Sequence, residues 1–186
     1  MRMPRRTVSR VAIVALLVAA ALSPSSAVGS IRAGRLGIGD SVMLGAKQEL
    51  HARGFGIVDA VVSRQFYAAP SRVIYWKRRG RLPENVVIHL GNNGIVELSD
   101  CAHAVQAAGS HRRVFLVTLK VPRSWRQLDN HRLHICARRF TNAYLIDWYG
   151  ASHDHPAWFA RDGYHLTASG QTAYASLVAR RIAATP

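Results

Sequence analysis

The stretch that decides the fold is Val86-Val87-Ile88-His89-Leu90-Gly91-Asn92-Asn93-Gly94, an almost unbroken apolar run that ends in a turn. Apolar character on both faces of a short run is typical of a strand buried in a parallel sheet. Asn-Gly favours turns, so the strand is expected to end where this dipeptide approaches. The run therefore predicts a buried parallel strand with polar side chains just past its carboxyl end.

Other apolar runs alternate with helical patterns, which predicts a three-layer α/β/α domain with a five-stranded parallel sheet. In such a doubly wound sheet, sites form outside the carboxyl ends of the strands. The spacing of Val42, Ala46 and Leu50 predicts one helix after the first strand, and Thr167 is the expected N-cap of the last helix. The expected strands span 36–39, 56–62, 86–90, 114–119 and 143–146, and the other helices lie within 64–79, 95–108 and 125–140.

The first 29 residues have the layout of a secretory signal peptide. Four arginines precede the 12-residue apolar run 11–22, and small residues follow it. A helix of this length rises about 18 Å, which is short of a bilayer core of about 30 Å. We therefore expect residues 1–29 to be a signal peptide, cleaved after Ala27 or Gly29, with an uncleaved N-terminal anchor as the alternative. Residues 30–186 are expected to form one domain that is secreted or held in the cell envelope.

The chain is strongly basic, with 25 Lys and Arg against 10 Asp and Glu. Removal of residues 1–29 takes away four arginines, which leaves 21 against 10, or about +11. Such an excess favours polyanionic surroundings such as wall polymers, anionic lipid surfaces or nucleic acid, but it identifies no fold. The arginines are scattered over expected helix ends and loops, and no nucleic-acid-binding motif accompanies them. We therefore expect a solvated basic surface and no nucleic-acid partner.

The two cysteines, Cys101 and Cys136, are expected on the helices before and after the fourth strand. Right-handed crossovers in one direction would place these helices side by side on one face of the sheet. An even pair in an exported chain suggests a disulfide, and two buried thiols are the alternative. The topology favours the disulfide.

Four polar residues are expected to meet at the carboxyl edge of the sheet. Ser41 follows the first strand, Asn93 follows the third, and Asp162 and His165 precede the last helix. They supply a nucleophile, an oxyanion donor, a base-orienting carboxylate and a general base. Each alone also has a structural explanation, as a helix cap or a turn residue. Their order along the chain predicts an acyl-transfer site.

Together, Gly39-Asp40-Ser41, Gly91-Asn92-Asn93 and Asp162-Gly163-Tyr164-His165 resemble the SGNH (GDSL-type) hydrolase superfamily. The chain is similar in particular to the extracytoplasmic SGNH domains of peptidoglycan O-acetyltransferases, over residues 35–184. This resemblance implies a flavodoxin-like three-layer fold and a Ser41–His165–Asp162 triad. No cofactor and no metal are expected.

The same resemblance implies an oxyanion hole made by the Ser41 amide, the Asn93 side chain and the amide of Ser63. Members of the superfamily usually carry glycine where this chain has Ser63. A serine still offers its backbone N–H, but its φ angle is more restricted than that of glycine.

Three further residues are candidates for substrate binding. Arg64 and Gln65 follow Ser63, and they either bind substrate or begin a helix. Trp158 either lines a sugar-binding groove or packs in the core. The run His153-Asp154-His155 lacks further ligands at suitable spacing, so we expect no metal there.

These observations predict an exported serine esterase or O-acyltransferase that acts through an acyl-Ser41 intermediate. The expected substrate is an O-acyl group of a cell-envelope glycan such as peptidoglycan, or a small acyl ester. A separate membrane protein is a possible acyl donor, and a monomer is expected. The alternatives are a non-catalytic, basic wall-glycan-binding module on the same fold and a nucleic-acid binder.

Overall fold

A computed structural model describes Met1 and residues 34–186 of the chain. The predicted leader, residues 1–29, otherwise lies outside the described residues. The described domain is built on one sheet with strand order β2-β1-β3-β4-β5, and all neighbouring strands are parallel. The predicted five-stranded parallel sheet is therefore confirmed. The strands are β1 (Arg35–Gly39), β2 (Phe55–Ala60), β3 (Asn85–His89), β4 (Arg113–Val117) and β5 (Ala143–Ile146).

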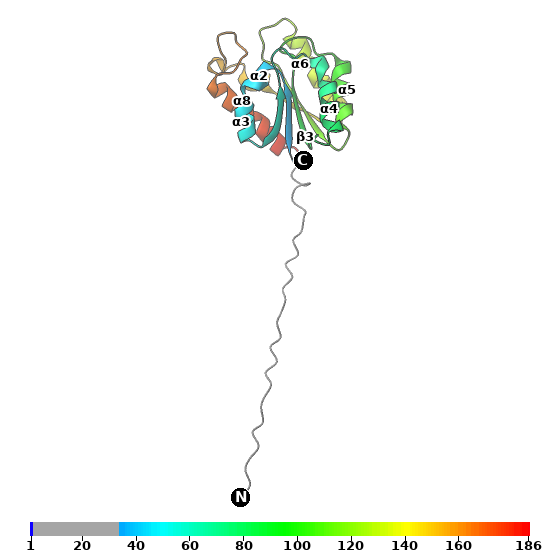
Figure 1. Cartoon of the computed structure of the whole chain (residues 1–186). Coiled ribbons are helices and arrows are strands. Elements are labelled where there is room, and N and C mark those ends of the chain that lie inside the picture. Colours follow the sequence, from blue (N-terminus) through cyan, green and yellow to red (C-terminus); the bar gives the residue numbers. More distant parts are fainter. Residues whose placement is uncertain (2–33) are drawn as a thin grey trace.

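Helices cover both faces of the sheet (Figure 1). On one face lie α4 (Ala69–Arg78), α5 (Leu98–Ala108) and α6 (Arg126–Arg139), and on the other lie α2 (Ser41–Gly45), α3 (Lys47–Ala52) and α8 (Ala168–Ala183). Each layer encloses its own apolar core against the sheet. Short elements complete the chain at η1 (Phe66–Ala68), α7 (Trp148–Ser152) and η2 (Pro156–Trp158). Within residues 34–186, no helix is both long and apolar enough to cross a membrane.

Strand β1 shows how the sequence builds the two layers. Leu36 and Ile38 point into the core beneath α4, α5 and α6. Gly37 and Gly39 point to the other face, where Met43 of α2 packs directly on the strand. A Cβ atom on Gly39 would lie only 2.4 Å from the Met43 Cβ. The glycines are therefore needed so that the helix carrying Ser41 can lie against the strand that precedes it.

The helix predicted from Val42, Ala46 and Leu50 is in fact two short helices. Ala46 separates α2 from α3, with φ −88° and ψ 7°. Gly45 directly precedes this break, and glycine weakens a helix interior. All three apolar side chains remain buried, so the spacing correctly identified the buried face.

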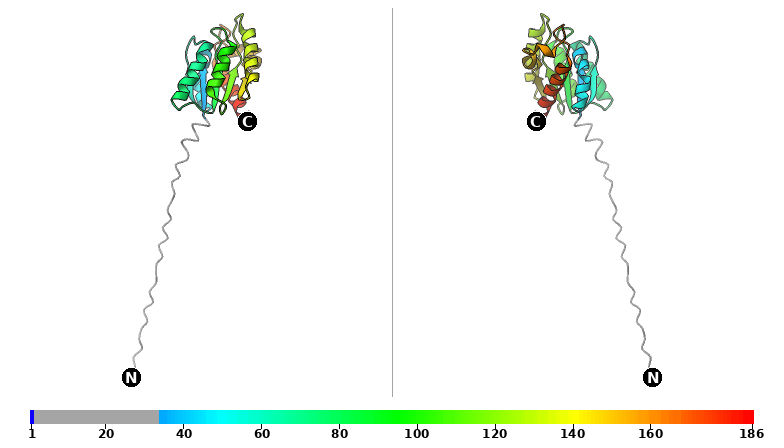
Figure 2. Two further views of the ribbon diagram at one scale, coloured as in Figure 1. Left: turned by 90° about the vertical axis from the view of Figure 1, so that its right-hand side faces the viewer. Right: turned by 90° about the vertical axis from the view of Figure 1, so that its left-hand side faces the viewer.

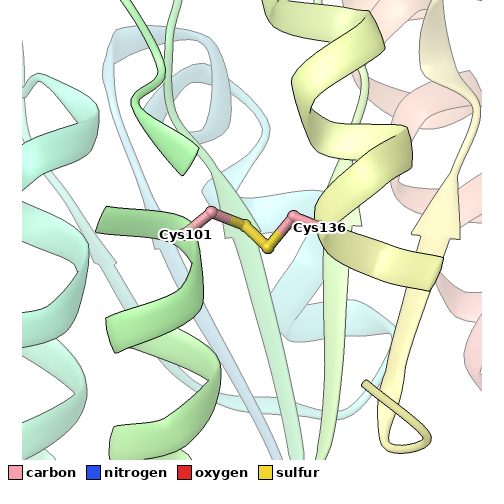
Figure 3. Close-up of a disulfide and its surroundings, with 2 residues drawn as sticks. All are labelled: Cys101 and Cys136. Carbon is pink, nitrogen blue, oxygen red and sulfur yellow. A yellow bond between two sulfur atoms is a disulfide. The ribbon is translucent and has the colours of Figure 1, made fainter. Parts of the chain in front are cut away.

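Figure 3 shows the disulfide that links Cys101 on α5 to Cys136 on α6, with 6.3 Å between the two Cα atoms. The helices pack side by side on one face, as the right-handed crossovers predicted. The predicted disulfide is confirmed.

Candidate active site

Ser41 is the first residue of α2 and directly follows the carboxyl end of β1. Asp40 caps this helix, and its Oδ1 atom accepts a hydrogen bond of 3.0 Å from the Val42 N–H. The cap fixes the turn between strand and helix, so the half-buried Ser41 side chain lies at the carboxyl edge of the sheet, where sites in this architecture form.

His165 and Asp162 lie on the loop between η2 and α8. This loop is tied back on itself by the Ala160 N–H, which donates to the His165 carbonyl at 2.7 Å, and by an antiparallel bridge between Phe159 and Leu166. The His165 Nε2 atom lies 2.9 Å from the Ser41 Oγ atom, although the two residues are 124 positions apart. The structure thus brings the predicted nucleophile and the predicted base into hydrogen-bonding distance.

Asp162 orients the imidazole from the opposite side. Its Oδ2 atom lies 2.6 Å from the His165 Nδ1 atom, while its Oδ1 atom accepts the N–H groups of Tyr164 and His165 at 3.1 and 3.0 Å. Because a carboxylate can only accept, these partners place the imidazole proton on Nδ1 and leave Nε2 free to accept the Ser41 hydroxyl proton. Desolvation raises the pKa of Asp162, but the hydrogen bonds from His165 and Tyr164 outweigh it, so the pKa lies below its usual value.

Asp40 also connects the serine turn to the loop after β3. Its fully buried Oδ2 atom accepts the side-chain N–H groups of Asn92 at 2.9 Å and of Asn93 at 3.2 Å. Burial raises the pKa of Asp40, although the hydrogen bonds from Asn92 and Val42 counteract part of this effect. An amide nitrogen carries two N–H groups, so Asn93 keeps one for another acceptor. The Asn93 side chain is therefore held beside the Ser41 turn, with one N–H group still free to donate a hydrogen bond.

Ser63 follows β2 and has a φ angle of 60°. Among the described residues, it is the only one other than glycine with a positive φ. This is the conformation that glycine adopts at no steric cost, which explains why glycine is usual at the position. The neighbouring Gln65 side chain packs over Gly94, where an added Cβ would lie 2.8 Å from the Gln65 Oε1 atom. The loop after β2 therefore contacts the loop that carries Asn93.

Asp59, near the end of β2, anchors the loop that carries Ser63. Its carboxylate accepts hydrogen bonds from Trp76 Nε1 at 2.7 Å, Arg72 Nε at 2.8 Å and Arg64 Nη2 at 2.8 Å. Desolvation raises the pKa of Asp59, but these hydrogen bonds outweigh it, so the pKa lies below its usual value. The Arg64 side chain also donates to the backbone carbonyls of Asp59 and Gly39. Arg64 thus holds the loop against the sheet, and its guanidinium contacts protein on several sides.

Trp158 packs on the α7 and α8 side of the molecule. Its ring stacks on His155 with 4.0 Å between centroids and on Trp148 with 5.8 Å. Trp148 itself is buried, as expected for a residue after a strand. Trp158 also lines a cavity of about 260 Å³ with residues of α8. Trp158 therefore contacts the α7 and α8 side of the molecule. Gln65, in contrast, lies beside the loop that carries Asn93.

The structure also tests whether a metal could be held. His153 Nε2 lies 3.0 Å from Asp154 Oδ2, and the His153 Nδ1 atom lies 3.0 Å from the Gly150 carbonyl oxygen. Within residues 34–186, no three His, Cys, Asp or Glu side chains are grouped so that they could hold a metal ion.

Two roles escaped the sequence analysis, namely those of Asp40 and Asp59. Asp40 was visible as part of the Gly39-Asp40-Ser41 motif, but the hydrogen bonds of Asp40 and Asp59 were not. A carboxylate in an apolar strand end needs several donors when it is buried, and the two consecutive asparagines, Asn92 and Asn93, were the signal for donors nearby.

No family model matches the chain. Over 149 residues, the chain is 32% identical to the O-acetyltransferase OatA of Staphylococcus aureus, a match that covers 77% of the chain and 24% of the relative. The peptidoglycan O-acetyltransferase OatA of Listeria monocytogenes is likewise 32% identical over 145 residues, covering 76% of the chain and 22% of the relative. The chain thus spans about a quarter of the length of these relatives.

Solved structures with the same fold include the C-terminal catalytic domain of peptidoglycan O-acetyltransferase A of Streptococcus pneumoniae, at a TM-score of 0.72 and 23% identity. That match covers 81% of the chain and 92% of the domain. A G-D-S-L family protein of Desulfitobacterium hafniense matches at a TM-score of 0.66 and 16% identity, covering 80% and 98%.

The motifs around Ser41, Asn93 and His165 resemble those of the SGNH (GDSL-type) superfamily, and the fold is that of these solved structures. The chain is homologous to a segment of the peptidoglycan O-acetyltransferases.

Proposed function

We propose that this chain is an exported serine esterase or O-acyltransferase that acts through an acyl-Ser41 intermediate. The observation that supports this most strongly is the unbroken series of hydrogen bonds from Ser41 Oγ through His165 to Asp162, at 2.9 and 2.6 Å. We further propose that it acts on O-acyl groups, above all O-acetyl groups, of a cell-envelope glycan such as peptidoglycan. The peptidoglycan O-acetyltransferases among the similar proteins support this substrate class.

In the first half of the reaction, the Ser41 Oγ atom attacks the carbonyl carbon of the ester while its proton passes to His165 Nε2. Asp162 holds the imidazole in place and stabilises its charged form. The carbonyl oxygen becomes an oxyanion. When the tetrahedral intermediate collapses, the C–O bond to the leaving alcohol breaks and His165 returns the proton to that alcohol. The product of this half-reaction is acyl-Ser41.

In the second half, a water molecule or a sugar hydroxyl attacks acyl-Ser41 and transfers its proton to His165 Nε2. Collapse then breaks the bond to Ser41 Oγ, which takes the proton back from His165. Water as acceptor gives hydrolysis to the free acid, and a sugar hydroxyl gives a new ester. Both outcomes share every residue of the site, so the choice depends on which acceptor reaches the acyl-enzyme.

We assign the oxyanion to three donors: the backbone N–H groups of Ser41 and Ser63 and the free side-chain N–H of Asn93. The contact of the Ser63 loop with the Asn93 loop and the hydrogen bond from Asn93 to Asp40 support this assignment. Donors that are held in place before the charge develops stabilise the transition state most, at about 3–4 kcal/mol for one donor.

The same proposal places the domain outside the cytoplasm, in the cell envelope or secreted, with residues 1–29 as its signal peptide. In the transferase reaction, the acyl group would come from a separate membrane protein or from a soluble ester. We expect a monomer to suffice, because one chain supplies every group assigned to the site.

Turnover of an acetyl ester tests the proposal. We expect the purified protein to release acetate from O-acetylated peptidoglycan fragments, or to transfer acetyl groups to a glycan acceptor, as measured by mass spectrometry of the products. Ser41→Ala is expected to lower kcat by roughly 10⁴-fold or more. Ser124→Ala, at an exposed serine in the loop after β4, is the matched control and is expected to retain the parent rate. Turnover that survives Ser41→Ala would exclude the acyl-Ser41 mechanism. Absence of turnover combined with salt-sensitive glycan binding would instead identify a non-catalytic wall-binding module.

A further inference from the structure

The charged side chains are separated along the axis of the sheet. In this fold all strands run toward the Ser41 edge and the helices run back, so the helices end at the opposite end of the molecule (Figure 2). Three of them finish with a pair of basic residues: Lys77 and Arg78 on α4, Arg138 and Arg139 on α6, and Arg180 and Arg181 on α8.

Further basic residues lie at the same end, before the strands or after the helices. We call this end the basal face and define it by its twelve Lys and Arg residues: Arg35, Arg53, Lys77, Arg78, Arg79, Arg81, Arg112, Arg113, Arg138, Arg139, Arg180 and Arg181. Two acidic residues accompany them, and both are already paired. Glu49 binds Arg53 at 2.5 Å, and Glu84 lies 3.6 Å from Arg113.

Within residues 34–186, most of the basic side chains on the basal face form no ion pair with a carboxylate. Eight of the twelve basic residues are exposed, and within residues 34–186 none of these eight lies within ion-pair distance of a carboxylate. The other eight acidic residues of the chain lie toward the Ser41 edge, near the carboxyl ends of strands, at the starts of helices or in the loops between α7 and α8: Asp40, Asp59, Glu97, Asp100, Asp129, Asp147, Asp154 and Asp162. The two ends of the molecule therefore differ in charge, and positive charge is concentrated at the end farthest from Ser41.

Local helix chemistry explains only part of this pattern. A cation near a helix C-terminus interacts favourably with the helix dipole, which accounts for the basic pairs on α4, α6 and α8. It does not account for Arg35, Arg81 and Arg112, which lie outside helices. The basic residues also span both helical layers, because α4 and α6 cover one side of the sheet and α8 covers the other. The charge thus covers a broad end of the domain.

The chain itself enters the domain at this end. Strand β1 begins at Arg35 on the basal face, and the C-terminus lies there as well (Figure 1). Residues 1–34, which contain the apolar run 11–22, therefore join the domain at the basal face. In the alternative in which residues 1–29 stay uncleaved as an anchor, this connection would bring the basal face toward the lipid and leave Ser41 on the far side.

We propose that the basal face rests on an anionic membrane surface, so that the Ser41 edge faces away from the membrane. Basic residues next to anionic lipid each strengthen binding, roughly fivefold per residue. The breadth of the charge fits an extended surface better than one polymer strand, which would need a groove. The basal residues take no part in the proposed reaction. Evidence against membrane binding would therefore leave the proposed function unaffected, and the reverse also holds.

The test compares two variants of the full chain that lose the same charge. The basal variant carries Arg78→Gln, Arg139→Gln and Arg180→Gln. The control variant carries Lys47→Gln, Arg123→Gln and Arg161→Gln, three exposed residues that are not among the twelve that define the basal face. The readout is the ratio of co-sedimentation with vesicles of phosphatidylcholine plus phosphatidylglycerol to that with phosphatidylcholine alone. This ratio cancels binding through the apolar N-terminal run, and thermal unfolding by circular dichroism checks that both variants are folded.

We expect the basal variant to lower the ratio by about a hundredfold and the control variant to change it by less than about threefold. Equal losses in both variants would mean that only net charge matters, and the proposal would be wrong. An unchanged ratio in the basal variant would also overturn it. If the basal variant instead loses binding to soluble linear polyphosphate while its vesicle ratio is unchanged, the face binds a polyanion other than lipid.

Discussion

Asp40 is the residue on which two loops of the site depend. Its buried carboxylate accepts N–H groups from Val42 at 3.0 Å, Asn92 at 2.9 Å and Asn93 at 3.2 Å. Through these bonds, one side chain fixes the start of the helix that carries Ser41 and the amide that is proposed to bind the oxyanion. Asp40 touches neither Ser41 Oγ nor the substrate in this scheme, so we regard it as a positioning residue.

Replacement of Asp40 by asparagine is expected to disturb this arrangement. An asparagine NH₂ group would face the donors of Asn92 and Asn93, which then lose their acceptor. We expect kcat/KM to fall by about 10- to 100-fold, as for a small displacement of a reacting group, and the free energy of unfolding to fall by about 1–3 kcal/mol. Ester kinetics and urea unfolding measure the two effects.

Asp154→Asn provides the control, because that carboxylate is 82% exposed and lies outside this network. It is expected to match the parent protein in both measurements. Parent-like kinetics in Asp40→Asn would show that the two loops hold their positions without the carboxylate.

Ser63 is the residue with the least common backbone conformation. A non-glycine residue at φ 60° costs about 1–2 kcal/mol, and the cost is higher for a β-branched side chain. Ser63→Gly is therefore expected to keep the parent kcat, because the amide remains and the strain is relieved. Ser63→Val is expected to lower the free energy of unfolding by about 1–2 kcal/mol and to lower kcat as the loop shifts.

The two variants are compared by ester kinetics and by chemical unfolding. Their different expected effects separate the role of the backbone conformation from that of the Ser63 hydroxyl, which both substitutions remove. If valine and glycine gave the same kcat and the same stability, the positive φ would not matter for the site.

At the residue scale, the sequence indicated which types of residue meet but not all of their hydrogen bonds. Serine is more restricted in φ than the glycine that is usual at position 63, but the sequence did not predict the positive φ of 60° that the structure has there. The role of Asp40 was not foreseen, because hydrogen bonds between side chains that follow β1 and β3 depend on the exact approach of two loops. Arg64 was considered for substrate binding without regard to Asp59, since five residues of separation give no sign of an ion pair across a loop.

At the scale of elements, the disulfide between α5 and α6 is the clearest stabilising link. It joins Cys101 and Cys136 with a sequence separation of 35. Closing a loop of this size in the unfolded chain corresponds to about 4 kcal/mol of stability in the chain-entropy description. Neither cysteine belongs to the loops that carry Ser41, Ser63 or His165.

The double variant Cys101→Ala/Cys136→Ala is therefore expected to lose about 2–4 kcal/mol of unfolding free energy and to keep the parent kcat at temperatures where it is folded. Guanidinium unfolding and ester kinetics measure these quantities. The reduced parent protein should unfold at the same denaturant concentration as the double variant. Equal stability of the oxidised parent and the double variant would contradict this account.

Most elements were predictable because a parallel sheet imposes a strong pattern. Strand β5 has the predicted bounds, and the other strands differ by one to two residues at one or both ends, where hydrogen bonding rather than hydrophobicity sets the limit. The single helix expected over Val42 to Leu50 was wrong, because spacing reports the buried face and not continuity of the backbone. Trp158 illustrates another limit, since an aromatic residue in a loop gives no sign of the layer on which it packs.

At the scale of the whole molecule, topology separates two kinds of surface. Parallel strands gather the loops that carry Ser41, Ser63, Asn93 and His165 at one end, and antiparallel helices gather basic residues at the other. The first result was predictable, since it follows from the order of strands and helices. The second was not foreseen, because arginines that are scattered along the sequence were expected to be scattered over the surface.

Covalent labelling of Ser41 by a sulfonyl fluoride, followed by intact mass measurement and peptide mapping, tests most directly whether the three loops form one reactive site. The folded protein is expected to gain one sulfonyl group on Ser41, as His165 removes the hydroxyl proton and fluoride leaves. His165→Ala is expected to slow the labelling by roughly 10³-fold or more, while His134→Ala, at an exposed histidine on α6, should label at the parent rate. A folded protein that stays unlabelled at Ser41, or that labels equally fast without the His165 imidazole, would contradict the account.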